Sequence, residues 1–130
     1  MRRILRKRRK REKSASTIVP ISTRLKDDTV TVEDRMELAV RQVYDPELPV
    51  NIYDLGLIYK LEFEAETGLA KVLMTLTAPN CPSADLILEM VRSIIRMIPE
   101  VKDVEVEITW EPPWEPEMIS DAAKLQMGLI

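Results

Sequence analysis

The chain has 130 residues, which is enough for one domain and too few for two. Apolar residues make up 45% of it and charged residues 32%, and no apolar run approaches the roughly 18 residues that a membrane span needs. With one cysteine and no histidine, the chain cannot form an intrachain disulfide, a self-contained zinc cage or a histidine-dependent catalytic site. Any chemistry must therefore come from Cys81, carboxylates, hydroxyls, lysines or the backbone.

Charge is distributed unevenly along the chain. Residues 1–13, the basic arm, carry nine of the 19 basic residues and one acidic residue, so their net charge is near +8. Residues 14–130 carry the other ten basic residues and 21 acidic residues, and their net charge is near −11. An acidic body is a poor binder of nucleic acid, whereas the arm alone could hold a polyanion without sequence specificity.

The basic arm allows three interpretations. Residues 1–30 are read first as a disordered arm and linker that precede a single domain of residues 31–130. Nonspecific contact of residues 1–13 with a nucleic acid or an anionic membrane surface is the second reading, and organelle import is the third. Because the arm lacks the apolar segment of a secretory signal, we expect a cytoplasmic protein in which Cys81 stays reduced.

The first helix is predicted to begin at Thr31. Thr31 followed by Asp34 is a variant of the capping box, in which side chains satisfy the first backbone N–H groups of a helix. Apolar residues then recur on one helical face, at Met36, Ala39, Val40 and Val43. The helix is expected to end at Asp45, because a residue that precedes proline is pushed out of the α region.

Two strands follow a proline-containing loop. Residues 57–64 alternate with a period of two, which places on one face Leu57, Tyr59, Leu61 and Phe63 and on the other face Ile58, Lys60, Glu62 and Glu64. Residues 69–76 alternate in the same way and place on one face Val72, Met74 and Leu76. Their short connection predicts an antiparallel hairpin.

A helix and a third strand complete the predicted domain. An apolar stripe over residues 82–98 indicates a long helix, with Pro82 at its first position and Pro99 after its end. Residues 103–108 alternate as a strand, and a strand–helix–strand crossover of this length favours parallel pairing. The expected fold class is α+β, a two-layer α-β-β-α-β domain with helices packed on one face of a small mixed sheet.

The C-terminal extension contains both tryptophans, Trp110 and Trp114, among three prolines. One interpretation is that the tryptophans pack back on the sheet and cover an edge. The other is that they form an exposed surface that binds a partner. Residues 118–126 are expected to form a short helix that begins near Glu117 or Ser120.

Cys81 is the strongest candidate for chemistry. It is predicted at or just before a helix N-terminus, where free N–H groups and the helix dipole lower the pKa of a thiol. A thiolate binds iron or attacks electrophiles. The alternative is that Cys81 is a small buried residue, as a free cysteine often is.

Carboxylates and hydroxyls form a second candidate group. Asp45, Glu47 and Asp54 lie within ten residues, in the loop before the first strand, and Thr75 and Thr77 lie near the end of the second strand. Antiparallel pairing brings the start of one strand beside the end of the other, so these residues and Cys81 are expected at one end of the sheet. The alternative is that the aspartates serve as helix cap and turn residues.

Three motifs resemble the MIP-type family of iron–sulfur cluster assembly factors, and most closely its SufT branch, to which PaaD is related. They are DPELPVNIYDLGLIY, LTAPNCPSAD and VEVEITWEPPWEPEMISDAAKLQMGL, in order within residues 32–130. The resemblance implies a similar fold and a role in iron–sulfur cluster maturation. It places the family's reactive cysteine at Cys81 and its acidic motif at Asp45, Pro46 and Glu47.

The resemblance leaves two functions open. In the first, the protein carries or delivers clusters to apoproteins through Cys81, as a transient or bridging ligand. One cysteine cannot supply four ligands, so a homodimer or small thiols would complete the site. In the second, the protein is an adaptor that links assembly proteins to client apoproteins without holding a cluster. An enzyme with Cys81 as nucleophile is disfavoured, because no histidine is present to activate it.

Overall fold

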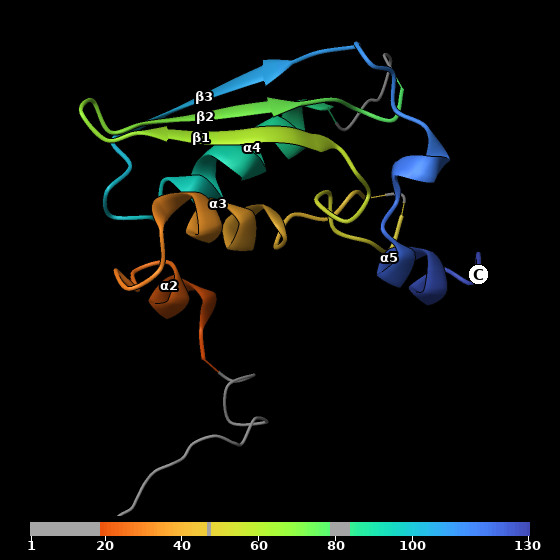
Figure 1. Ribbon diagram of the computed structural model, residues 1–130, viewed down its shortest axis with the longest axis horizontal. Coiled ribbons are helices and arrows are strands. Elements are labelled where there is room, and N and C mark those ends of the chain that lie inside the picture. The colour runs from red at the N-terminus through yellow and green to blue at the C-terminus, as the bar shows by residue number, and fades with distance from the viewer. Residues whose placement is uncertain (1–18, 47, 79–83) are drawn as a thin grey trace, which may run out of the picture.

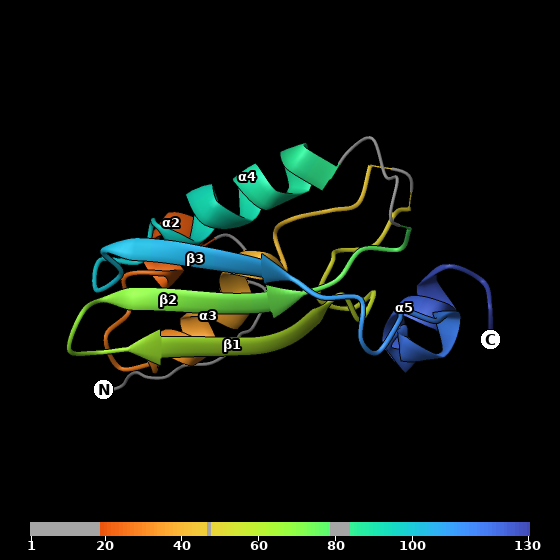
Figure 2. The same cartoon turned by 90° about the horizontal axis from the view of Figure 1, so that it is seen from above.

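The protein forms two layers, with helices on one face of a three-stranded sheet (Figures 1 and 2). The computed structural model describes residues 19–46, 48–78 and 84–130. In chain order the elements are α2 (Ile21–Arg24), α3 (Val32–Val40), β1 (Ile58–Glu64), β2 (Leu69–Met74), α4 (Ala84–Ile95), β3 (Asp103–Ile108), the 3-10 helix η1 (Pro116–Met118) and α5 (Asp121–Gln126). The predicted α+β fold is confirmed.

The sheet has the order β1-β2-β3, and its pairing is mixed as the sequence predicts. β1 pairs antiparallel with β2, placing Leu61 opposite Val72. β2 pairs parallel with β3, placing Val72 opposite Val106. The parallel pair is joined through α4, which is long enough to return the chain to the same end of the sheet.

The predicted alternation is wrong near the start of β1, where the strand contains a β-bulge. Ile58 lies opposite Met74, whereas Lys60 lies opposite Leu73, so Tyr59 is an extra residue in β1. Ile58 therefore packs against the core, although simple alternation places it on the face of the charged residues. The Tyr59 hydroxyl instead donates to the Pro112 carbonyl at 2.7 Å, which ties the C-terminal segment to the sheet.

The N-terminus of α3 is confirmed, and its predicted end is wrong. The Thr31 hydroxyl accepts a hydrogen bond from the Asp34 N–H at 3.1 Å, as the capping-box pattern indicates. The α-helix ends at Val40, before Asp45, because the next N–H groups bond three residues back, as in Val43 N–H to Val40 O. Val43 is still buried, since this tighter turn keeps it on the core side.

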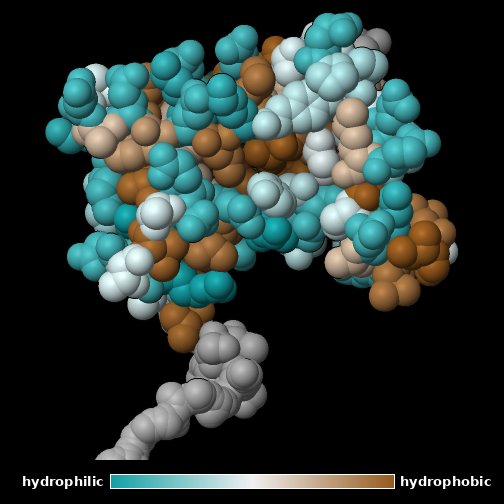
Figure 3. All heavy atoms as spheres, viewed as in Figure 1, coloured by the Kyte–Doolittle hydropathy of each residue, from teal (hydrophilic) through white to brown (hydrophobic). Residues whose placement is uncertain are grey.

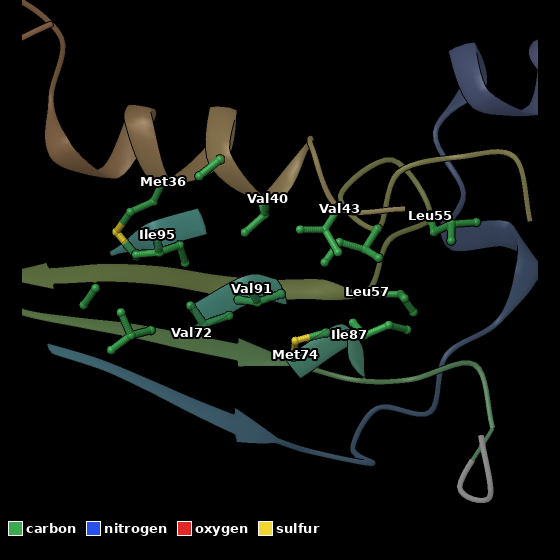
Figure 4. Close-up of a cluster of buried hydrophobic side chains, with 14 of the residues drawn as sticks. Met36, Val40, Val43, Leu55, Leu57, Val72, Met74, Ile87, Val91 and Ile95 are labelled. Carbon is green, nitrogen blue, oxygen red and sulfur yellow. The ribbon is translucent and has the colours of Figure 1, made fainter. Parts of the chain in front are cut away.

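The core lies between the helices and the sheet. Figure 4 shows apolar side chains from α3, α4 and β2 meeting there. They include Met36 and Val40 from α3, Val91 and Ile95 from α4, and Met74 from β2, all 0% exposed. At about 1.5–3 kcal/mol for each large apolar side chain, this burial is the main stabilising contribution.

Arg35 fastens the chain before α3 to the rest of the domain. Its side chain is only 2% exposed, and its guanidinium donates to the carbonyls of Leu25 and Val30 at 3.1 and 3.0 Å. It also forms a bidentate ion pair with Glu100, with N···O distances of 2.8 and 2.6 Å. Leu25 is fully buried, so part of the predicted linker packs into the core, whereas residues 1–18 lie outside the described residues.

The Glu100 carboxylate makes stability depend on pH. Its hydrogen bonds from Arg35 lower the pKa of Glu100, so the stabilisation is complete above the unfolded-state pKa and is lost as pH falls through the lower folded-state value. We expect Glu100→Gln to reduce the free energy of unfolding by about 1 kcal/mol at pH 7, since Glu100 is partly solvent-exposed. Urea unfolding at pH 7, 5 and 3.5 should show the difference shrinking; a constant difference would contradict this linkage.

Candidate functional site

The carboxylate loop and the end of β2 lie at the same end of the sheet. The loop that precedes β1 is closed by hydrogen bonds from Ile52 N–H to Val43 O and from Leu57 N–H to Ile52 O, at 2.8 and 3.1 Å. The Thr75 N–H in turn donates to Leu57 O at 2.9 Å. The backbone thus connects the loop directly to the residues that lead into segment 79–83, which contains Cys81. Cys81 and Glu47 lie outside the described residues, so their roles stay predictions.

Thr75 has a buried hydroxyl at this end of the sheet. The residue is 0% exposed, and its Oγ1 has no hydrogen-bond partner in the part of the chain that the structure describes. A buried hydroxyl without a partner costs about 1–3 kcal/mol, so such groups are uncommon, and they are typically satisfied by a water, an ion or a ligand. Thr77, two residues on, is half-buried.

The two aspartates of the loop differ in their surroundings. Asp45 is 7% exposed and lies beside the bridge between Tyr44 and Asn51. Asp54 is engaged by the loop itself, since its carboxylate accepts hydrogen bonds from Arg41 and from the Asn51 amide, both at 3.0 Å. This bonding supports the interpretation of Asp54 as a turn residue, and its role in chemistry stays a prediction.

Arg41 was not among the residues that sequence reasoning selected. Its guanidinium pairs with Asp54 at 3.0 Å and Glu37 at 3.2 Å, and lies 4.3 Å from the centre of the Tyr53 ring. Burial alone would lower the pKa of Arg41, but these two carboxylates outweigh it and raise that pKa. Burial, with Glu37 nearby, raises the pKa of Tyr53. Together, these contacts of Arg41 hold the loop that precedes β1 against α3.

The two tryptophans have different surroundings. Trp114 packs against the core, and its indole N–H donates to the Leu55 carbonyl at 2.7 Å. Trp110 is 43% exposed. Trp114 thus packs against the domain, as the first interpretation predicts, whereas of the two tryptophans Trp110 alone is classed as exposed. A partner for either residue stays a prediction.

The C-terminal segment runs past this end of the sheet and is fastened to the loop (Figure 2). The Ser120 N–H donates to Asp54 O at 2.8 Å, and the Ser120 hydroxyl accepts from Ala123 N–H, which confirms Ser120 as the cap of the short helix. The Gln126 amide donates to Pro49 O at 3.4 Å.

Gly56 is where the C-terminal segment comes closest to the loop. It has φ +85°, and a Cβ there would lie 2.5 Å from the Met118 carbonyl oxygen. We expect Gly56→Ala to lower the free energy of unfolding by about 3 kcal/mol, because backbone strain and overpacking add. Gly128→Ala is the matched control: φ is +80° but nothing lies within 4 Å, so about 1 kcal/mol is expected. Urea unfolding followed by tryptophan fluorescence measures both; equal losses would contradict the packing argument.

The described residues contain neither a cluster suited to a metal ion nor a helix suited to a membrane. In residues 19–46, 48–78 and 84–130, no three side chains of the metal-binding types Cys, Asp and Glu gather closely enough to hold an ion. None of the described helices has the length and apolarity required to cross a membrane.

Comparison with known proteins identifies the family. Residues 33–108 match the model of a family described as iron–sulfur cluster assembly protein. The chain belongs to this family. It is 44% identical to an Fe-S protein maturation auxiliary factor of Porphyromonas gingivalis, over 82% of this chain and 100% of the relative. It is also 44% identical to the Fe-S protein maturation auxiliary factor SufT of Staphylococcus aureus, over 67% of this chain and 98% of that protein.

A solved structure shows that the fold is shared. A domain of unknown function, DUF59, from Bacillus anthracis matches with a TM-score of 0.71 and 36% identity, covering 76% of this chain and 93% of that one. The resemblance to iron–sulfur assembly factors drawn from the motifs is therefore confirmed at the level of the family.

Proposed function

We propose that this protein is an iron–sulfur cluster maturation factor that carries or delivers clusters to apoproteins, with Cys81 as a ligand. Family membership supports the process, and so do the names of its relatives. An iron–sulfur cluster carrier protein of Synechocystis is 31% identical over 62% of this chain, although the match spans only 22% of that larger protein. These relatives are named as auxiliary factors and carriers, which agrees with a protein that is not an enzyme. We place its action in the cytoplasm, where Cys81 stays reduced.

In this proposal the cluster is cargo, and Cys81 supplies one ligand. A cluster needs about four protein or thiol ligands, so a second chain, a small thiol or the client must supply the others. A homodimer that shares one cluster between two Cys81 thiolates satisfies this requirement. Assembly proteins would load the cluster and client apoproteins would receive it.

The single observation that carries the site is the buried Thr75 hydroxyl, which has no hydrogen-bond partner among the described residues. It lies six residues before Cys81, at the end of the strand that leads into the cysteine's segment. A hydroxyl there is suited to donate a hydrogen bond to a thiolate or a cluster sulfide, and such bonds tune and retain clusters. Thr77, Asp45, Glu47 and Asp54 are proposed as supporting groups.

The adaptor function remains the second candidate, and a groove favours it. An apolar groove of about 300 Å³ lies where the turn after α3 meets α4, lined in part by Val43, Met90 and Met97. Leu86, which also lines it, is 57% exposed, so the apolar surface extends beyond the groove. The exposed Trp110 adds a second apolar surface. An adaptor would use such surfaces without holding iron.

Anaerobic reconstitution tests the function. The wild-type chain is incubated with iron and sulfide, and iron and sulfide per chain, visible absorption and molar mass are measured. We expect a bound cluster with charge-transfer absorption, and about one cluster per two chains if a dimer shares it. A chain that gains no cluster but still captures client apoproteins would support the adaptor instead.

Thr75→Val separates a ligand-binding hydroxyl from a structural one. The change removes an unpartnered hydroxyl, so the free energy of unfolding should stay the same or rise. The reconstituted variant should lose its cluster about fivefold faster than wild type, as expected for one lost hydrogen bond of about 1 kcal/mol. Absorption decay under a chelator measures the rate, and an unchanged rate would remove Thr75 from the site.

A further inference from the structure

A groove runs along the free edge of β1. Among the described residues β1 pairs only with β2, so its outer edge presents unpaired backbone groups. Between this edge and α3 lie two adjoining hollows of about 360 and 230 Å³, which share Glu33 and Leu61 in their walls. Figure 3, viewed as Figure 1, shows apolar atoms exposed here between bands of polar ones.

The β1–α3 groove has an apolar floor and an acidic rim. The floor includes the half-buried Leu61 and Phe63. Four glutamates stand around it, two from α3 and two from β1, namely Glu33, Glu37, Glu62 and Glu64. Three of them pair with a cation of the domain, at 3.2, 3.0 and 4.0 Å for Glu37, Glu62 and Glu64. Glu33 has no ion pair within the described residues.

Such a groove suits an extended segment that is basic and partly apolar. A segment that adds to a sheet edge gains main-chain hydrogen bonds, while side chains on alternate positions reach the pockets beside the edge. The carboxylates on the rim exclude an acidic segment and favour Arg and Lys. Pairing of two copies of β1 would bring few cations to this rim, since β1 itself carries one lysine, Lys60.

The basic arm of the same chain matches this description. Residues 1–13 contain nine basic residues with Ile4 and Leu5 among them, and their net charge is near +8. The described chain begins at Val19, and Arg35 holds Leu25 and Val30 against α3, which is one wall of the groove. The 18 residues before it span about 60 Å when extended, far more than the roughly 23 Å of a seven-residue strand such as β1.

We propose that the basic arm binds along the free edge of β1, in the β1–α3 groove of its own chain. Its arginines and lysines face the glutamates of the rim, and its apolar pair covers Leu61 and Phe63. Because the same cations would bind a polyanion, docking of the arm and polyanion binding compete. Docking weakens steeply as salt concentration rises, since the rim is exposed to solvent.

Amide hydrogen exchange tests the docking. In the full chain at low salt, amides on the outer edge of β1 should exchange about tenfold more slowly than in a variant that lacks residues 1–13. The same amides should regain protection when a peptide of residues 1–18 is added to that variant. Unchanged exchange of β1 on removal of the arm would overturn the proposal, whether or not the arm binds polyanions. Protection that rises with protein concentration would assign the groove to a second copy's arm, and overturns it also.

Matched charge variants test where on the domain the arm binds. In the variant without the arm, Glu33→Gln combined with Glu62→Gln should weaken binding of the peptide about tenfold, at about threefold for each exposed pair. Glu105→Gln combined with Glu107→Gln makes the same change on β3, at the opposite edge of the sheet, and should weaken it less than twofold. Equal losses in both variants would show general attraction to an acidic body and overturn the assigned groove.

Discussion

Replacing Cys81 by serine should remove nearly all of the iron and sulfide that the wild-type chain gains on anaerobic reconstitution. Serine keeps the size of the side chain but offers a hydroxyl where iron requires a thiolate. Loss of a group that only contacts a metal ligand already costs about 10–100-fold in metal affinity. Loss of the ligand itself should cost at least as much, so the iron and sulfide retained should fall below about a tenth of the wild-type amount. Metal and sulfide analysis of the desalted proteins measures this directly.

Ser83→Ala is the control for Cys81→Ser, because it makes a change of similar size two residues along the same segment. It should retain iron and sulfide as the wild type does. If Cys81→Ser and wild type retain equal amounts, Cys81 is not a ligand, and the carrier function through this residue fails. If neither the wild type nor Cys81→Ser retains iron and sulfide, while the wild type still binds a client apoprotein, the adaptor function gains support.

Replacing Arg35 by methionine should lower the free energy of unfolding by about 3 kcal/mol. The change keeps an apolar stem of similar length but removes the donors to Leu25 O and Val30 O and the partner of Glu100. A buried carbonyl without a donor costs about 1–3 kcal/mol; the hydrogen bond to Leu25 O is buried and the one to Val30 O is partly buried. Glu100 is 39% exposed, so water limits the further cost of leaving it alone. Domains of this size are stable by about 5–15 kcal/mol, so the loss is large.

Arg41→Met provides the matched control for Arg35→Met. Arg41 also bridges carboxylates, but its side chain is 35% exposed and its partners are side chains at the surface of the loop. We expect a loss of about 1 kcal/mol there. Urea unfolding of both variants decides the matter, and an Arg35→Met variant as stable as Arg41→Met would show that burial of the Arg35 guanidinium adds nothing.

Local chemistry made much of the fold predictable. Thr31 and Ser120 were identifiable as caps because a cap uses only residues three positions away. The parallel pairing of β2 with β3 followed from the length of the helical crossover. The bulge at Tyr59 was not predictable from the alternation, and the partner of the Tyr59 hydroxyl, Pro112 O, lies 53 residues further along the chain.

The candidate site was only partly predictable for the same reason. Strand pairing correctly indicated that the loop before β1 and the end of β2 share one end of the sheet. The sequence could not show that Arg41 forms an ion pair with Asp54, because each residue has several residues of opposite charge near it in the sequence. Nor could it show that Arg35 would be buried, since its ion-pair partner Glu100 is 65 positions away. Contacts between distant positions depend on packing that no local pattern specifies.

The bond between Gln126 and Pro49 brings the C-terminal helix beside the carboxylate loop, while the described chain starts near the other end of the sheet (Figure 1). This arrangement has a practical consequence for how the protein is handled. A purification tag or fusion partner joined after residue 130 would stand next to the end of the sheet that leads into the cysteine segment, where the proposed function places the cluster. Assays of the proposed cluster transfer should therefore use a chain without a tag after residue 130.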